Sequence, residues 1–257
     1  MGSGHAVAAV QVTNATVKYG SVIALKNADL ELFSGRITGL AGVNGSGKST
    51  LMKSILGLMD LNEGAITVQG GSVSDARRKA QIAYVAQSEA IDESFPLSVR
   101  QVIEMGRYGA LGPLRMLKKS DAELCDRAMQ RTGITHLGDR LIGELSGGQR
   151  KRVFLARAIA QQANIMLLDE PFSGVDITSQ ESIIAVIRSL AADGVSILVS
   201  SHDIASLADI CDEVVLWYQR SLFSGPPETA LSEHNLALAF TAGAEIQVTT
   251  ETMENYL

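Results

Sequence analysis

The segment Gly42-Val43-Asn44-Gly45-Ser46-Gly47-Lys48-Ser49-Thr50 fits the pattern G-x-x-x-x-G-K-[ST]. Apolar residues 37–40 precede it, and Leu51, Ile55 and Leu58 follow it at helical spacing. A glycine-rich loop between a strand and a helix can turn its backbone N–H groups toward a phosphate, and the helix N-terminus adds a positive dipole there. Because the strand and the helix stand on the expected sides, the pattern predicts a phosphate-binding loop rather than a chance glycine-rich turn.

Every residue of this loop is a candidate for nucleotide binding. Glycines at 45 and 47 let the backbone turn its N–H groups inward. Lys48 is expected to reach the β- and γ-phosphates of ATP, the Ser49 hydroxyl to ligate Mg²⁺, and Thr50 to contact the α-phosphate side. The predicted cofactors are therefore ATP and Mg²⁺. The predicted nucleotide-binding residues of the loop are Gly42, Val43, Asn44, Gly45, Ser46, Gly47, Lys48, Ser49 and Thr50.

A second motif is the acid pair Asp169 and Glu170, which follows an apolar strand predicted at residues 165–168. Ligands of open α/β sheets bind at the carboxyl ends of the strands. Successive side chains of a strand point in different directions, so the two acids can take different roles. We expect Asp169 to hold Mg²⁺ through its water and Glu170 to orient or deprotonate the attacking water. A simple strand-to-helix cap is the alternative, and the upstream phosphate loop favours the catalytic interpretation.

The third motif is Leu145-Ser146-Gly147-Gly148-Gln149-Arg150, and a helical run over residues 153–160 follows it. Alone, it could be a helix N-cap with a flexible turn, although glycines before a helix also make a second phosphate-binding terminus. Together with the acid pair downstream, it resembles the signature of the nucleotide-binding subunits of ATP-binding cassette (ABC) transporters. The resemblance covers residues 10–231.

The resemblance implies a homodimer that forms head to tail in the ATP-bound state. ATP would lie between the phosphate loop of one subunit and the signature of the other. Two such phosphate-binding termini cannot easily serve one γ-phosphate within a single chain, which agrees with that arrangement. The residues that would contact the ATP of the partner subunit are Ser146, Gly147, Gly148 and Gln149.

Three further positions match the family one at a time. By resemblance, Tyr19 would stack on adenine, Gln87 would lie near Mg²⁺ and the attacking water, and His202 would contact the γ-phosphate. Residues 173–176 likewise resemble the loop that communicates between the two subunits. The predicted catalytic residues are thus Lys48, Glu170 and His202, and the predicted Mg²⁺ ligands are Ser49, Gln87 and Asp169.

The fold implied by the resemblance is α/β: the P-loop NTPase cassette fold, with an N-terminal antiparallel β layer, a mainly parallel core sheet and an inserted helical subdomain. Alternating and β-branched residues predict strands at 10–17, 28–33 and 37–40, which we assign to a strand-rich N-terminal layer. We predict further strands at 64–70, 165–168, 196–199 and 214–218, and helices at 50–58, 99–105, 120–131 and 178–192. One ABC ATPase domain is expected at 7–240, its helical subdomain at 88–162, and an unassigned tail at 241–257.

Composition narrows the class of protein. The 257 residues are 46% hydrophobic, which is ample for a packed core. A net charge of −6 argues against nucleic-acid binding, and short basic runs at 77–79 and 150–152 are expected to be solvated. No apolar run approaches the roughly 20 residues that span a bilayer, and residues 1–5 do not resemble a signal peptide. Cys125 and Cys211 are isolated, which predicts reduced core thiols. We therefore expect a cytoplasmic protein.

The cargo is suggested by segments 94–99, 105–109 and 169–176, which resemble the branch of the family that imports manganese, zinc or iron. The Met-Gly-Arg-Tyr element at 105–108 also occurs in siderophore, haem and cobalamin importers, whereas Phe172-Ser173-Gly174 favours the metal-ion branch. The implied partners are two membrane-spanning permease subunits and, indirectly, an extracytoplasmic metal-binding protein. The chain would then be peripheral on the cytoplasmic face of the cell membrane.

Two other classes of function are weighed against this one. A soluble mechanochemical ABC ATPase usually carries a coiled-coil insertion or two cassettes, but this chain has one phosphate loop, one signature and no sustained heptad pattern. A nucleotide or small-molecule kinase would share the phosphate loop but would leave residues 145–149 unexplained. Both alternatives are less favoured than the importer subunit.

Overall fold

The computed structural model describes residues 8–87, 96–111, 116–237 and 239. Several sequence-based expectations fall outside these residues: the start at 1–5, positions 94 and 95 of the metal-branch resemblance, the domain ends at 7 and 240, and the tail at 241–257.

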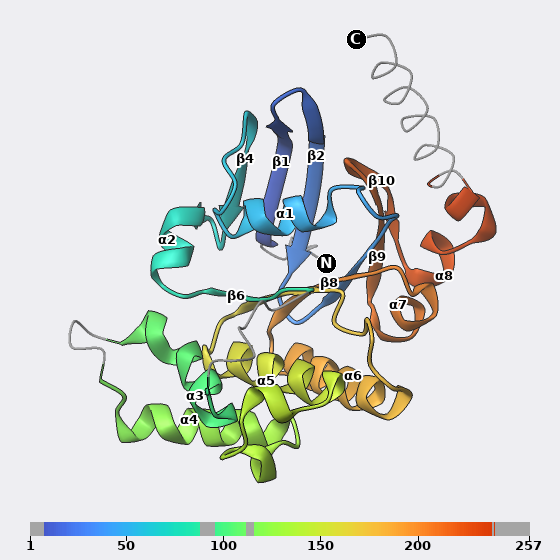
Figure 1. Ribbon diagram of the computed structural model, residues 1–257. Coiled ribbons are helices and arrows are strands. Elements are labelled where there is room, and N and C mark those ends of the chain that lie inside the picture. The colour runs from blue at the N-terminus through green and yellow to red at the C-terminus, as the bar shows by residue number, and fades with distance from the viewer. Residues whose placement is uncertain (1–7, 88–95, 112–115, 238, 240–257) are drawn as a thin grey trace, which may run out of the picture.

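Within the described part of the chain, the strands form two sheets (Figure 1). The first is antiparallel, with strand order β2-β1-β4-β5. Its strands are β1 (Ala8–Tyr19), β2 (Val22–Phe33), β4 (Glu63–Val68) and β5 (Gly71–Ser72). The second has the order β10-β9-β3-β8-β7-β6 and is parallel except for β10. Its strands are β3 (Ile37–Ala41), β6 (Ile82–Val85), β7 (Ile165–Asp169), β8 (Ser196–Ser201), β9 (Glu213–Tyr218) and β10 (Arg220–Gly225).

The position of β3 corrects one prediction. We assigned residues 37–40 to the N-terminal strand-rich layer, but β3 lies in the middle of the parallel sheet, between β9 and β8. All five of its residues are buried, as expected for a strand whose sheet is covered on both faces. The antiparallel layer instead includes β4, in which Val68 pairs with Val10 of β1.

The helices cluster between and after the strands of the parallel sheet. They are α1 (Lys48–Ile55), α2 (Val73–Arg78), α3 (Val99–Glu104), α4 (Lys119–Arg131), α5 (Gly147–Ala160), α6 (Ile177–Ala192), α7 (Ile204–Ile210) and α8 (Pro227–Ala230). Short 3₁₀ helices are η1 (Met105–Ala110), η2 (Thr135–Leu137) and η3 (Ile142–Glu144). None of the helices in the described residues combines the length and the apolar character that crossing a membrane requires.

Two hydrophobic cores cover opposite faces of the parallel sheet. On one face, Leu167 packs in a cluster with Val12 of β1 and Leu51 of α1. On the other face, Leu168 packs in a cluster with Ile187 of α6 and with residues of α5. Alternate residues of β7 therefore belong to different cores, as the pleat of a strand requires. Figure 1 shows the antiparallel sheet and α1 on one side of the parallel sheet and α5 and α6 on the other.

Helices α3 and α4 pack on α5 and on each other, in the region where the helical subdomain was predicted (Figure 1). The Met-Gly-Arg-Tyr element at 105–108 lies in η1, which packs on the end of α5. A Cβ on Gly106 would lie 2.2 Å from the carbonyl oxygen of Arg157, so a side chain does not fit there. Arg107 is buried, pairs with Asp121 at 3.0 Å and donates to the Ala160 carbonyl at 2.8 Å. The first part of this element thus serves helix packing.

Both cysteines are free and buried, Cys125 in α4 and Cys211 at the end of α7. Burial raises the pKa of the Cys125 thiol to about 11 and that of Cys211 to about 12.

Because the thiolate is the reactive form, we expect neither thiol to react within minutes with a disulfide reagent such as DTNB at pH 8. Both should react in denaturant. Rapid release of thionitrobenzoate from the native protein would contradict the burial of these residues.

Candidate functional site

The phosphate loop lies between β3 and α1 and is enclosed by backbone from two other strands. Gly47 is the N-cap of α1 and has φ of +92°, and a Cβ there would lie 2.4 Å from the Ala24 carbonyl oxygen of β2. A Cβ on Gly42 would lie 2.3 Å from the Trp217 carbonyl oxygen of β9. Glycine is therefore required at both positions. The N–H of Gln219 donates to the Ser46 carbonyl at 2.7 Å and fixes the tip of the loop.

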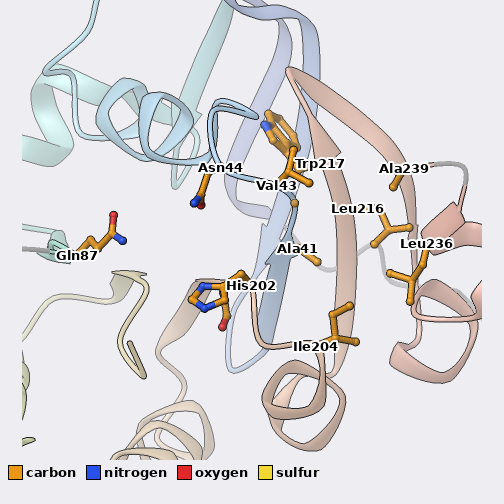
Figure 2. Close-up of a pocket in the computed structure, with 12 residues that line it drawn as sticks. Ala41, Val43, Asn44, Gln87, His202, Ile204, Leu216, Trp217, Leu236 and Ala239 are labelled. Carbon is orange, nitrogen blue, oxygen red and sulfur yellow. The ribbon is translucent and has the colours of Figure 1, made fainter. Parts of the chain in front are cut away.

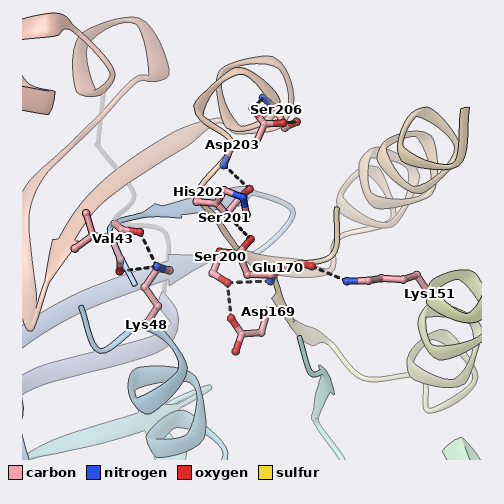
Figure 3. A network of polar contacts seen from close by, with 11 residues as sticks. Val43, Lys48, Lys151, Asp169, Glu170, Ser200, Ser201, His202, Asp203 and Ser206 are labelled. Atoms are coloured by element: carbon pink, nitrogen blue, oxygen red, sulfur yellow. Dashed lines mark hydrogen bonds and ion pairs between the residues drawn. The ribbon is translucent and has the colours of Figure 1, made fainter. Parts of the chain in front are cut away.

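Lys48 points back across its own loop. Its Nζ donates to the carbonyl oxygens of Gly42 at 2.6 Å and Val43 at 3.1 Å (Figure 3). Burial lowers the pKa of Lys48 below its ordinary value, while the carboxylates of Glu170 and Asp169 act in the opposite direction. The Lys48 ammonium group is thus held at the opening of the phosphate loop, close enough to Asp169 and Glu170 for their carboxylates to affect its pKa.

The acid pair ends β7, as predicted, and Asp169 meets the phosphate loop. Its Oδ2 accepts a hydrogen bond from Ser49 Oγ at 2.7 Å and from Tyr84 OH at 3.3 Å. Its Oδ1 accepts from Ser200 Oγ at 2.6 Å. The carboxylate is almost fully buried yet has three hydroxyl donors, so its charge is well compensated. Two of the three predicted Mg²⁺ ligands, Ser49 and Asp169, are therefore in contact.

Glu170 has a left-handed backbone, with φ of +52°, which is rare for a residue other than glycine. Its N–H donates to the hydroxyl and the carbonyl of Ser200, at 3.1 and 3.2 Å. Its Oε2 lies 2.8 Å from Nδ1 of His202. The Glu170 side chain is only 5% exposed, whereas that of His202 is 64% exposed. Figure 3 shows Lys48 to one side of the group formed by Asp169, Glu170 and His202.

A cavity of about 330 Å³ joins these groups. It is lined by residues 44–50 of the phosphate loop, Gln87, Asp169 and Glu170. Tyr19 stands beside it, 47% exposed, with its OH 3.4 Å from Thr50 Oγ1. The structure thus brings together the loop, the acid pair and Gln87, with Tyr19 and His202 at the edges.

A neighbouring pocket of about 320 Å³ shares Asn44 and Gln87 with this cavity. Figure 2 shows His202, Asn44 and Gln87 at one side of it and the apolar side chains of Leu216, Leu236 and others at the opposite side. Since the lining of this pocket lacks Lys48 and the acid pair, we assign the phosphates to the first cavity.

The signature forms the start of α5. Ser146 is the N-cap, and its Oγ accepts from the Gln149 N–H at 3.3 Å while the Gln149 side chain accepts from the Ser146 N–H at 3.0 Å. This capping box leaves other N–H groups of the first turn unpaired within the helix. Among the described residues that line the phosphate cavity, none belongs to the signature.

A model of the ABC transporter family matches residues 25–173, which are more than half of the chain. The chain belongs to the ABC transporter family. It is an ATP-hydrolysing cassette of that family, and the match includes the phosphate loop, the signature and the acid pair. The family resemblance found in the sequence and the predicted cassette fold are thereby confirmed.

Three relatives of this ABC ATPase resemble it over most of its length. The Yersinia pestis protein named chelated iron transport system membrane protein YfeB is 46% identical over 89% of this chain and 78% of its own. The manganese transport system ATP-binding protein MntA of a Synechocystis strain is 42% identical over 90% of this chain and 89% of its own. The zinc transport system ATP-binding protein TroB of Treponema pallidum is 38% identical, with coverages of 90% and 86%.

A solved structure is similar to this ABC ATPase in fold. It is a chain of an ABC transporter in an inward-facing conformation, assigned to the metal-chelate type, with a TM-score of 0.80 and 27% identity. The likeness covers 91% of this chain and 89% of that one.

Three residues beside the acid pair were not predicted from the sequence: Tyr84, Ser200 and Lys151. The Lys151 Nζ donates to the Glu170 carbonyl at 2.8 Å, so the expectation that the run at 150–152 is solvated is wrong for Lys151. Burial lowers the pKa of Lys151, against the influence of Glu170 and Asp169. Ser200 could have been suspected, because a hydroxyl at the end of an apolar strand, two residues before His202, falls at the site edge of the sheet.

The two signature glycines of the ABC ATPase differ in their surroundings, which gives a test of the packing. A Cβ on Gly148 would lie 2.4 Å from Ser179 Oγ, which is held by Asp176 at 2.8 Å. A Cβ on Gly147 would meet only the Gly174 carbonyl at an ordinary 3.5 Å. Gly148→Ala is therefore expected to destabilise the fold by roughly 1–3 kcal/mol.

The measurement is thermal unfolding of both variants. Gly148→Ala should lower the melting temperature by several degrees, given about 2–4 °C per kcal/mol for a chain of this size. Gly147→Ala is the matched control, because alanine gains the same helix propensity at both positions. Equal melting temperatures for the two variants would show that α5 does not approach α6 as described.

Proposed function

We propose that this chain is the ATP-hydrolysing subunit of a membrane importer that takes up a divalent metal ion: manganese, zinc or iron. The observation that carries the enzymatic part is one cavity in which Lys48 and Ser49 of the phosphate loop face Asp169 and Glu170. The relatives' names support the cargo. The alternatives named above, a siderophore, haem or cobalamin importer or a soluble mechanochemical ATPase, become outcomes of the tests below.

The residues present fit a magnesium ion. Mg²⁺ prefers oxygen ligands, and Ser49 Oγ and Asp169 Oδ2 are oxygens 2.7 Å apart in the phosphate cavity. The side-chain amide of Gln87 lines the same cavity and can offer a third oxygen. When bound with ATP, Mg²⁺ would neutralise charge on the β- and γ-phosphates. Ser49, Gln87 and Asp169 are thus the residues that would hold the ion.

The remaining steps belong to side chains of this chain. Lys48 would bind the β- and γ-phosphates, and the backbone N–H groups of the loop would donate hydrogen bonds to the phosphate oxygens. Glu170 would orient or deprotonate the attacking water, because its carboxylate opens into the cavity while its backbone is fixed. His202 would contact the γ-phosphate and keep the Glu170 carboxylate in place through the 2.8 Å contact. Tyr19, exposed beside Thr50, would stack on the adenine.

We propose that the ATP-bound form is a head-to-tail homodimer. Support comes from the separation of the two anion-binding helix starts, since the signature at Ser146–Gln149 does not line the chain's own phosphate cavity. A second copy would bring its signature to the phosphates bound here. ATP would then favour the closed dimer because it contacts both subunits there, and hydrolysis would release it.

The proposed partners in the membrane are two permease subunits, and an extracytoplasmic metal-binding protein would act indirectly through them. No nucleic-acid partner is proposed. The chain would bind the permeases from the cytoplasmic face. Tyr108, 52% exposed at the end of the Met-Gly-Arg-Tyr element, and Met116 lie in the helical region that would receive them. The predicted boundaries of that subdomain, 88–162, and of the whole domain, 7–240, stay part of this proposal.

The first test is Glu170→Gln. The amide keeps the size of the side chain but cannot accept a proton, so hydrolysis should fall at least roughly a hundredfold while ATP binding persists. An ATP-bound dimer should accumulate and be visible by size-exclusion chromatography with light scattering. Turnover at the wild-type rate would remove Glu170 from its proposed role.

Lys48→Ala is the complementary variant. Removal of the ammonium group should weaken ATP binding by an order of magnitude or more, because its charge-assisted contacts to the phosphates are lost. Isothermal titration with ATP measures this directly, with Glu170→Gln as the control that retains affinity. Unchanged affinity in Lys48→Ala would contradict the assignment of the phosphate loop.

The cargo is tested by uptake of labelled Mn²⁺, Zn²⁺ and Fe²⁺ into cells that lack this chain. Restoration of one metal's uptake by the wild type, and not by Glu170→Gln, would establish both the cargo and its dependence on hydrolysis. If no metal responds, chelated iron, haem and cobalamin are tested next in the same strain. A response to none of them would favour the soluble ATPase.

A further inference from the structure

Lys151 connects the signature helix to the acid pair. It lies on α5, and Gly147 lies four residues before it, so both residues are on the same face of the helix. Its side chain crosses to the end of β7, where Nζ donates to the backbone carbonyl of Glu170 at 2.8 Å (Figure 3). The bond is charge-assisted and partly shielded from water, and hydrogen bonds of this kind are the strong ones.

The carbonyl that Lys151 binds belongs to a strained residue. Glu170 has φ of +52°, and a left-handed conformation at a residue other than glycine persists only where its surroundings enforce it. On the N-terminal side, the Glu170 N–H is held by Ser200. On the C-terminal side, the carbonyl accepts from the Ser173 N–H at 3.2 Å and from Lys151. Of these partners, Lys151 is the one that comes from α5.

The same helix end touches the loop after Glu170 at a second point. A Cβ on Gly147 would be in van der Waals contact with the carbonyl oxygen of Gly174, so the signature and this loop lie against each other. Gly148 packs on Ser179, at the start of α6. The loop 170–174 therefore lies against the first two turns of α5, at the Gly147–Gly174 contact and at the Lys151 hydrogen bond.

We propose that Lys151 is a positioning residue for hydrolysis: it fixes the backbone of Glu170 to the signature helix, so that a signature engaged by the partner's nucleotide holds Glu170 in its left-handed conformation. The proposal rests on the function proposed above, in which Glu170 acts on the attacking water. It assigns Lys151 no contact with ATP. It follows that loss of the Lys151 bond should slow turnover without weakening ATP binding.

The test compares Lys151→Met, which keeps the length of the side chain but removes its donors, with Lys151→Arg, which keeps the charge and can donate. Lys79→Met, on an exposed residue at the end of α2, is the matched control. Turnover number and KM for ATP are measured for each purified full-length variant. Backbone amide exchange of the segment 170–174 is measured without nucleotide, which reports the link independently of activity.

In Lys151→Met, we expect the turnover number to fall roughly tenfold, as for the loss of one charge-assisted hydrogen bond, with KM for ATP within about twofold of wild type. The amides of Glu170 and Ser173 should exchange faster. Lys151→Arg should recover most of both properties, and Lys79→Met should match the wild type.

Two results would overturn the proposal. One is unchanged exchange over residues 170–174 in Lys151→Met. The other is a parallel loss of melting temperature and ATP affinity that arginine does not rescue, because that pattern reports a purely structural lysine. Failure of the proposed function would give a different result, namely turnover that persists in Glu170→Gln. In that case the exchange measurement still decides whether Lys151 holds the loop.

Discussion

Parallel pairing in the order β3-β8-β7 determines where every chemical group of this ATPase lies. The phosphate loop follows β3, His202 follows β8 and the acid pair ends β7. The register aligns these ends, because Ala41 pairs with Ser201 and Asp169 with Ser200. Residues separated by more than a hundred positions, such as Ser49 and Asp169, come within a hydrogen bond for this reason. Short, fully buried strands achieve this only because helices and the antiparallel sheet cover both faces.

The elements that could be predicted from the sequence are those with a local pattern. The phosphate loop, β7 and the capped start of α5 each combine a distinctive run of residues with the expected neighbours. The placement of β3 could not be predicted, because a buried strand of five residues does not show which sheet it joins. The partly buried, weakly alternating β10 and the short helix α7 were not predicted either, since their patterns are too brief to distinguish from loop.

Within the site, sequence reasoning found the residues that belong to a motif or match a family position. It missed Tyr84, Ser200 and Lys151, which hold the acid pair in place. Lys151 binds a carbonyl oxygen, and Ser200 accepts from a backbone N–H, so neither contact has a partner that can be recognised as a residue type. Both contacts depend on the left-handed backbone of Glu170, which only the assembled fold displays. The Met-Gly-Arg-Tyr element is the opposite case, because the sequence suggested a link to the cargo. In the structure, Gly106 and Arg107 are explained by packing on α5 and give little information about cargo.

The enclosure of the phosphate loop by the carbonyls of Ala24 and Trp217 makes nucleotide recognition a property of the whole fold. One carbonyl comes from the antiparallel sheet and the other from the parallel sheet, so the loop takes its shape only after both sheets have formed and docked. An unfolded or half-folded chain therefore offers ATP no site. By mass action, cellular ATP then acts as a folding ligand, which draws newly made chains toward the native state and shields them from proteolysis.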